Sequence, residues 1–102
     1  MSGDVLEILK VWLDRRQGAL ESLGVAVSTT WGPSDREPAS AWVDFATAEK
    51  SARLIVWSSG LADLTVGDFV KGEVLLDEHR EISSEVGFDD AETTVRAWLV
   101  DG

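Results

Sequence analysis

The sequence predicts an α+β fold, with a helix at each end of the chain and an antiparallel sheet of four or five strands between them. Apolar residues recur at three- and four-residue steps up to Leu23, alternate with polar residues from Val25 to Ile82, and return to helical spacing before Val100. Strands that follow one another along the chain form a meander, and the simplest arrangement places both helices on one face of the sheet. We expect the 102 residues to form a single domain, residues 1–102.

The first helix is predicted from Val5 to Leu23. Ser2 or Asp4 can accept a hydrogen bond from the unpaired amide groups of its first turn, and Gly24 suits the left-handed conformation common just past a helix end. The residues expected on its buried face are Val5, Ile8, Leu9, Trp12, Leu13, Ala19, Leu20 and Leu23.

Four segments show the alternation typical of strands: "VAVSTTW", "SAWVDFA", "ARLIVWSS" and "GEVLLDEHREI". Between the first two, "GPSDREP" is a predicted loop, since Pro33 and Pro38 cannot donate a backbone hydrogen bond to a sheet. The segment from Leu61 to Val70, "LADLTVGDFV", is either a further strand or a short irregular connection.

A final helix is predicted to end near Val100. The preceding "SSEVGFDD" interrupts the regular pattern, and Asp89 or Asp90 can cap the helix that follows. The residues expected on its buried face are Ala91, Val95, Trp98 and Leu99.

Charge is distributed unevenly along the chain, whose net charge is −10. From Met1 to Gly60 eight acids accompany six bases, whereas from Leu61 to Gly102 eleven acids accompany three bases. Such a field repels nucleic acid and anionic membranes and attracts basic partners, although acidity alone also keeps a small protein soluble. The chain has no cysteine, its first residues lack the basic start and uninterrupted apolar run typical of a signal peptide, and no apolar run reaches membrane-spanning length, so we expect a cytoplasmic location.

Two short patterns are candidates for chemistry. Asp77, His79 and Glu81 alternate, so on a strand they project to one face, where they either bind a divalent metal or simply meet solvent. The serines of "VWSSG" do not match a nucleophile motif, and Ser58, Ser59 and Gly60 read as a turn. With no phosphate-binding loop and no basic patch, we predict no cofactor, no catalytic residue and no enzymatic activity.

The five tryptophans fall into two groups. Trp12 and Trp98 lie on the apolar stripes of the predicted helices and are expected in the core. Trp42 and Trp57 occupy the strand face opposite to the β-branched and phenylalanine positions, so they decorate a face that the helices leave open, with Trp31 a candidate to join them. An uncovered aromatic patch indicates a partner or self-association surface, unless loops bury it.

Several of these stretches together resemble the bacterial TriTu immunity proteins. They are "LKVWLDRR" in the first helix, the strand "AWVDF", the strand and turn "ARLIVWSSG", and the acidic "GEVLLDEHREI" ahead of a short helix with a tryptophan. The resemblance, which spans most of the chain, implies a protein that binds and neutralises a cognate polymorphic toxin. It matches Trp42, Trp57 and Gly60 to recurrent family positions, which suit the scaffold better than direct contacts.

The charge and the resemblance lead to one hypothesis about binding. A toxin that acts on nucleic acid has a basic substrate groove, and carboxylates on an inhibitor can occupy its phosphate positions. The alternative hypothesis is a structural or regulatory module that homodimerises through the open aromatic face. The residues predicted to contact a partner are Asp77, Glu78, Glu81, Glu85, Asp89, Asp90, Trp42 and Trp57.

Overall fold

The helices and strands follow the predicted order along the chain. The computed structural model describes residues 5–32 and 39–101, so the predicted caps Ser2 and Asp4 and nearly all of the "GPSDREP" loop lie outside the described residues. Over the described ranges, no helix combines the length and the apolar character needed to cross a membrane. The elements are α1 (Val5–Ser22), β1 (Ala26–Trp31), β2 (Ser40–Ala46), β3 (Lys50–Trp57), β4 (Leu61–Asp68), β5 (Glu73–Glu81) and α2 (Glu85–Leu99).

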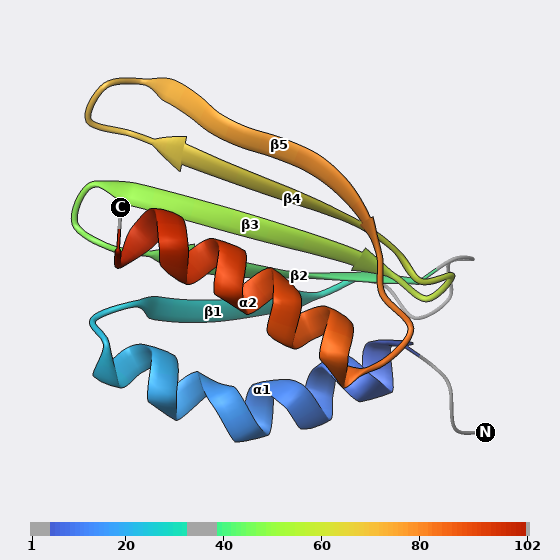
Figure 1. Ribbon diagram of the computed structural model, residues 1–102. Helices are drawn as coiled ribbons and strands as arrows, with labels where there is room; N and C mark the ends of the chain where they lie inside the picture. The colour runs from blue at the N-terminus through green and yellow to red at the C-terminus, as the bar shows by residue number, and fades with distance from the viewer. Residues whose placement is uncertain (1–4, 33–38, 102) are drawn as a thin grey trace.

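The five strands form one antiparallel meander in the order β1-β2-β3-β4-β5 (Figure 1). The segment whose structure the sequence left open is therefore a regular strand, β4, up to Asp68. Its pairing with β5 shifts register between Val66 and Gly67. This irregularity is a β-bulge, in which an extra residue on one strand changes the local twist.

Both helices cover the same face of the sheet, as the meander predicted. Figure 1 shows α2 crossing in front of the sheet, with α1 beside it near β1. Val43 pairs with Leu54 and Leu54 pairs with Leu64, and all three side chains are buried on the face that the helices cover. The largest fully buried side chains are Trp12, Phe45, Phe88, Leu9, Leu20, Leu54, Leu64 and Ile82.

Most of the predicted core positions on the helices are confirmed, with exceptions at the edges. Trp12 is fully buried and its ring stacks on Phe88, with the ring centroids 5.6 Å apart. Trp98 is only half-buried, although it packs against the core. The prediction that Ala19 and Leu23 are buried is wrong: both side chains are exposed, although Leu20 between them is fully buried.

The predicted start of the final helix is wrong by about one and a half turns. The residue at the N-cap is Ser84, and Asp89 and Asp90 lie inside α2. Gly87, which made this segment look irregular, has a packing role: a Cβ there would lie 2.9 Å from the side chain of Ile82. Glycine thus lets the first turn of α2 approach the residue that follows β5.

Candidate functional site

The face of the sheet that the helices do not cover is called here the open face. Its residues are paired across the strands in rows: Trp42 is opposite Ile55, Ile55 is opposite Asp63, and Asp63 is opposite His79. Within residues 5–32 and 39–101 no helix packs on this face. The prediction that Trp42 and Trp57 lie there is confirmed by the alternation of burial along β2 and β3.

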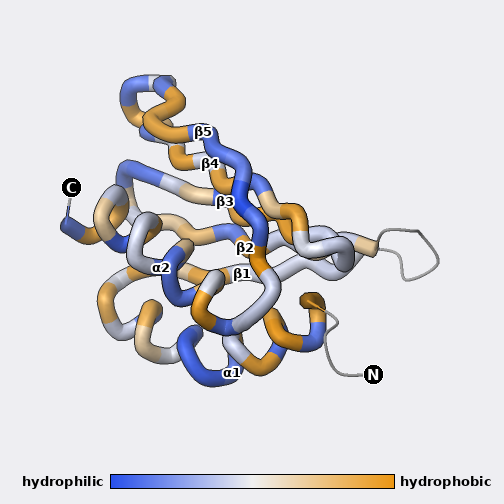
Figure 2. Tube along the Cα trace, turned by 45° about the vertical axis from the view of Figure 1, so that its right-hand side comes forward, coloured by the Kyte–Doolittle hydropathy of each residue, from blue (hydrophilic) through white to orange (hydrophobic). Residues whose placement is uncertain are grey.

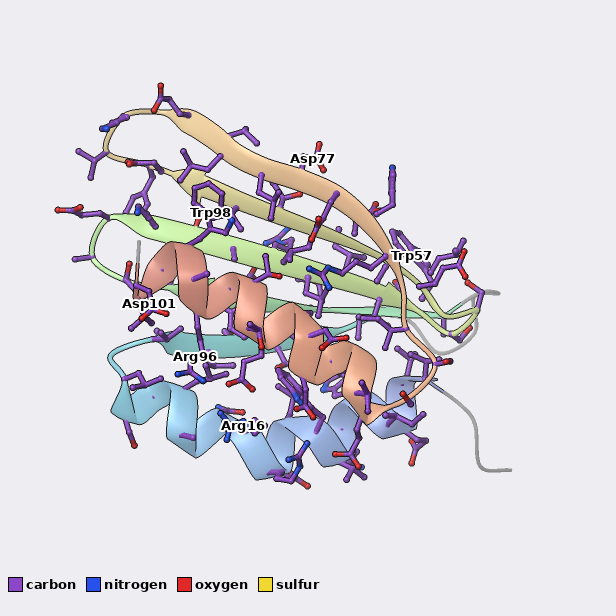
Figure 3. The ribbon with its side chains drawn as sticks, viewed as in Figure 1. Arg16, Trp57, Asp77, Arg96, Trp98 and Asp101 are labelled. Atoms are coloured by element: carbon purple, nitrogen blue, oxygen red, sulfur yellow. The ribbon has the colours of Figure 1, made fainter. Side chains whose placement is uncertain are left out.

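One end of the open face is aromatic and apolar. Trp42, Ile55 and Trp57 are half-buried there, and Leu61 at the start of β4 is 55% exposed. Figure 3 shows Trp57 at the end of the sheet where β3 leads into β4. A patch of large apolar side chains that stays this accessible to solvent is typical of a binding surface.

Arg53 joins this aromatic end to the middle of the face. Its guanidinium lies 5.8 Å from the centre of the Trp42 ring and donates two hydrogen bonds to Asp44, at 2.7 Å and 3.2 Å. The pKa of Arg53 is raised above its ordinary value, mainly by the hydrogen bond to Asp44 and to a smaller extent by attraction to the charge of the same carboxylate. A cation stacked on an indole ring and held by a fork of two hydrogen bonds is a stable way to place a guanidinium.

The other side of the open face, on β5, is acidic. Asp77 and Glu81 are exposed on this strand, on either side of His79. The register with β4 confirms that the three side chains share one face, as the alternation predicted. Figure 2 shows the corresponding hydrophilic stretch along β5, and Figure 3 labels Asp77 on it.

His79 does not gather a set of metal ligands. Its Nδ1 atom contacts Oδ1 of Asp63 on the neighbouring strand, while the imidazole itself is 90% exposed. Among residues 5–32 and 39–101, no three histidine, cysteine or acidic side chains lie close enough together to hold a metal ion.

Among the described residues, two hollows lie along the open face. The larger has a volume of about 480 Å³ and includes Trp57, Leu61, Asp63 and His79 in its lining. The smaller, of about 410 Å³, lies at the far ends of the strands and includes Gly67. The face is therefore uneven, with room for side chains of a partner.

The turn at the aromatic end is structural. Gly60 has a φ of 97° and donates a backbone hydrogen bond of 2.9 Å to Trp57, while Ser58 Oγ accepts one of 3.1 Å from the amide of Ala39. The prediction of a turn at Ser58, Ser59 and Gly60 is confirmed, and it holds Trp57 at the rim of the larger hollow.

Three predicted contact residues are placed away from the open face. Glu78 pairs in register with Leu64, so it lies on the helix-covered face, where it binds Arg80 at 2.6 Å. Glu85 and Asp89 both bind Arg15 of α1, at 2.9 Å and 3.2 Å. Their carboxylates connect the two helices to each other.

Two further predictions concern single residues. Asp90 is exposed on α2, apart from the open face. The expectation that Trp31 joins Trp42 is wrong, because Trp31 pairs with the buried Ala41 and so lies on the helix side of the sheet, 49% exposed. The eight predicted residues are thus divided, with Trp42, Trp57, Asp77 and Glu81 on the open face.

Sequence reasoning missed the contributions of β4 to the open face. Leu61 and Asp63 lie there because the alternating "LADLTV" places Ala62, Leu64 and Val66 in the core. That alternation was the available signal. It was not used because the segment had not been assigned as a strand.

Comparison with known proteins gives a family but no individual relative. The family model described as "Immunity protein TriTu" matches residues 7–98, which include both helices nearly completely and all five strands. Searches of curated proteins and of solved structures each found no match. The chain therefore belongs to the TriTu family of immunity proteins.

Proposed function

We propose that this immunity protein neutralises a cognate toxin in the cytoplasm by binding it through the open face of the sheet, without catalysing a reaction. One observation carries the proposal: an aromatic end and an acidic side meet on a face that the helices leave uncovered. Family membership supports an immunity role and a toxin partner.

The two parts of the open face suit two parts of binding. Aromatic side chains such as Trp42 and Trp57 supply large contact areas and are enriched among the residues that dominate interface energies. The exposed carboxylates of Asp77 and Glu81 speed the approach of a basic partner and oppose acidic ones. A toxin with a basic, nuclease-like groove fits this combination.

The proposal assigns the contacts to four of the eight residues predicted from the sequence: Trp42, Trp57, Asp77 and Glu81. The carboxylates of Glu78, Glu85 and Asp89 bind arginines of the same chain, so contact with a toxin would have to compete with these ion pairs. Asp90 is accessible but lies on α2, apart from the open face, so the proposal assigns it no contact.

The test measures affinity for the cognate toxin domain. We expect the charge-reversed variant Asp77→Lys/Glu81→Lys to bind about tenfold more weakly at low salt, with a smaller loss at high salt. The matched control is Glu7→Lys/Asp14→Lys, which makes the same change of charge at exposed positions of α1. Titration calorimetry at two salt concentrations gives both values, and equal losses in the two variants would contradict the proposal.

Homodimerisation through the same open face is the second candidate function, favoured by the exposure of its aromatic end. Sedimentation velocity separates the two candidates. A monomer at micromolar concentration supports toxin binding, whereas a dimer that survives high salt and is lost on Trp57→Ser supports the homodimer.

A further inference from the structure

We propose that the larger hollow of the open face is a binding site for an arginine side chain of the partner. It is called here the Trp57 hollow, and its lining includes Trp57, Leu61, Ala62, Asp63, His79 and Arg80. The chemistry of the site is read from this chain alone. The identity of the partner as the toxin rests on the proposed function.

The walls of the Trp57 hollow are of two kinds. Trp57 and Leu61 offer apolar surface on neighbouring strands, and the side chain of Leu61 is more than half exposed. Asp63 supplies a carboxylate that is 32% exposed. A ligand for this site needs an apolar stem and a cationic end, which are the two parts of an arginine or lysine side chain.

The same face already holds one guanidinium with the same two kinds of group. Arg53 of β3 lies over the ring of Trp42 on β2. It also forms a fork of hydrogen bonds with Asp44, which follows Trp42 by two residues on β2. In the Trp57 hollow, an indole and a carboxylate line a common space, and no arginine of the described chain is stacked on the indole. The hollow thus repeats the indole and carboxylate that surround Arg53, without an arginine stacked on the indole.

Arginine fits these groups better than lysine does. A planar guanidinium stacks on an indole and donates two parallel hydrogen bonds to a carboxylate, whereas an ammonium group is a compact and strongly hydrated charge. The exposed Glu81, which pairs in register with Leu61, adds negative charge beside the hollow.

Two basic residues of the chain itself also line the hollow. Arg80 directs its guanidinium to Glu78 and to Thr94 of α2, at 2.6 Å and 2.7 Å, so its charge is neutralised on the helix side. His79 contacts Oδ1 of Asp63 and therefore competes with an incoming arginine for that carboxylate. If His79 competes in this way, its removal should strengthen the binding of an arginine. Loss of a purely structural contact would instead leave the affinity unchanged or lower it.

The experiment titrates the purified chain, labelled with ¹⁵N, with N-acetyl-arginine amide and records the indole N–H signals of its tryptophans by NMR. We expect the Trp57 signal to shift and saturate, while the signal of Trp31 on the opposite side of the sheet stays in place. N-acetyl-citrulline amide, which has nearly the same shape without the charge, should bind at least about threefold more weakly. Equal shifts with citrulline, a stronger response to N-acetyl-leucine amide, or no saturable shift of Trp57 would each overturn the assignment.

Two substitutions test the roles of individual groups. Asp63→Asn should weaken binding of the arginine probe about two- to fivefold. His79→Ala should strengthen it by a similar factor, because it frees the Asp63 carboxylate. The control Trp31→Phe should change neither the affinity nor the Trp57 signal, and weaker binding by His79→Ala would contradict the competition.

The toxin gives a separate result. If the toxin uses the Trp57 hollow, Trp57→Leu should weaken its binding about tenfold or more, and Asp63→Asn should weaken it less. Full toxin affinity in both variants would overturn the use of the hollow by the toxin while leaving toxin binding itself established. Failure of the wild-type chain to bind the toxin would instead overturn the proposed function, and the arginine titration would still decide the chemistry of the hollow.

Discussion

The ion pair between Arg16 and Glu92 connects α1 to α2 beneath the surface of the helical layer. Glu92 is only 4% exposed and accepts hydrogen bonds from Arg16 at 2.8 Å and 2.6 Å, while Arg96 lies 3.7 Å away. Figure 3 labels Arg16 on α1 and Arg96 on α2. The pKa of Arg16 is raised above its ordinary value, mainly by the hydrogen bond to Glu92 and to a smaller extent by attraction to the charge of Glu92. Arg16→Met would therefore leave a buried carboxylate with only the longer contact to Arg96.

The structure sets the size of this loss. Removing one partner of a buried ion pair costs about 3–5 kcal/mol, and 28% of the Arg16 side chain is exposed, so water can partly replace it. We expect Arg16→Met to cost about 3 kcal/mol and Glu92→Leu about 2 kcal/mol. The double variant removes both charges and should cost only about 2 kcal/mol, which leaves a coupling energy of about 3 kcal/mol.

Urea unfolding at neutral pH measures these values. For an m-value of about 1.5 kcal/mol per molar urea, Arg16→Met should lower the unfolding midpoint by about 2 M. The matched control is Arg15→Met, since Arg15 is half exposed and its partners Glu85 and Asp89 are also exposed, so the loss should stay below about 1 kcal/mol. Additive losses in the double variant, or an equal loss in the control, would refute the reasoning.

The pH dependence of this pair follows from the direction of the pKa shift. A raised pKa means that the folded state holds the proton of Arg16 more tightly, so the stabilisation is complete below the unfolded-state pKa and is lost only as the pH rises through the folded-state pKa. Both values lie far above neutrality. The titration of Arg16 therefore adds no slope to the free energy of unfolding between about pH 6 and pH 9.

Further predictions concern packing within the helical layer. Trp12→Phe removes a 3.0 Å hydrogen bond from the indole to Asp89 and part of a fully buried ring. Thermal unfolding should show that the free energy of unfolding falls by about 1–2 kcal/mol. An unchanged melting temperature would mean that neither contact contributes. Gly87→Ala should cost about 1–3 kcal/mol because the new methyl group meets Ile82. Gly18→Ala, with nothing within 4 Å, should instead stabilise the helix by about 0.5–1 kcal/mol, and the same sign for both glycines in urea unfolding would contradict the packing argument.

The alternation along the strands was enough to predict which faces of the sheet are buried. In β2 and β3, Val43, Phe45, Leu54 and Val56 are buried, and the residues between them lie on the opposite face. This prediction succeeded because the side-chain period of a strand is two, so one buried residue fixes the direction of the rest.

The helix termini and the acidic surface were harder to predict. The start of α2 was assigned too late because Gly87 reads as a helix breaker unless the nearby Ile82 side chain is known. The carboxylates of Glu85 and Asp89 looked available, but their partner Arg15 is about 70 residues away in the sequence. Charge counts along a chain cannot show such long-range pairs, since these depend on how the helices pack.

The most direct test of the central claim follows the tryptophan signals when the toxin binds. In an NMR spectrum of the ¹⁵N-labelled chain, we expect unlabelled toxin to shift or broaden the indole signals of Trp42 and Trp57. The indole signal of Trp31, on the helix side of the sheet, should show only the uniform broadening of a larger complex. Changes confined to Trp31 and to amides of α1 and α2 would place the toxin on the helical layer and contradict binding through the open face.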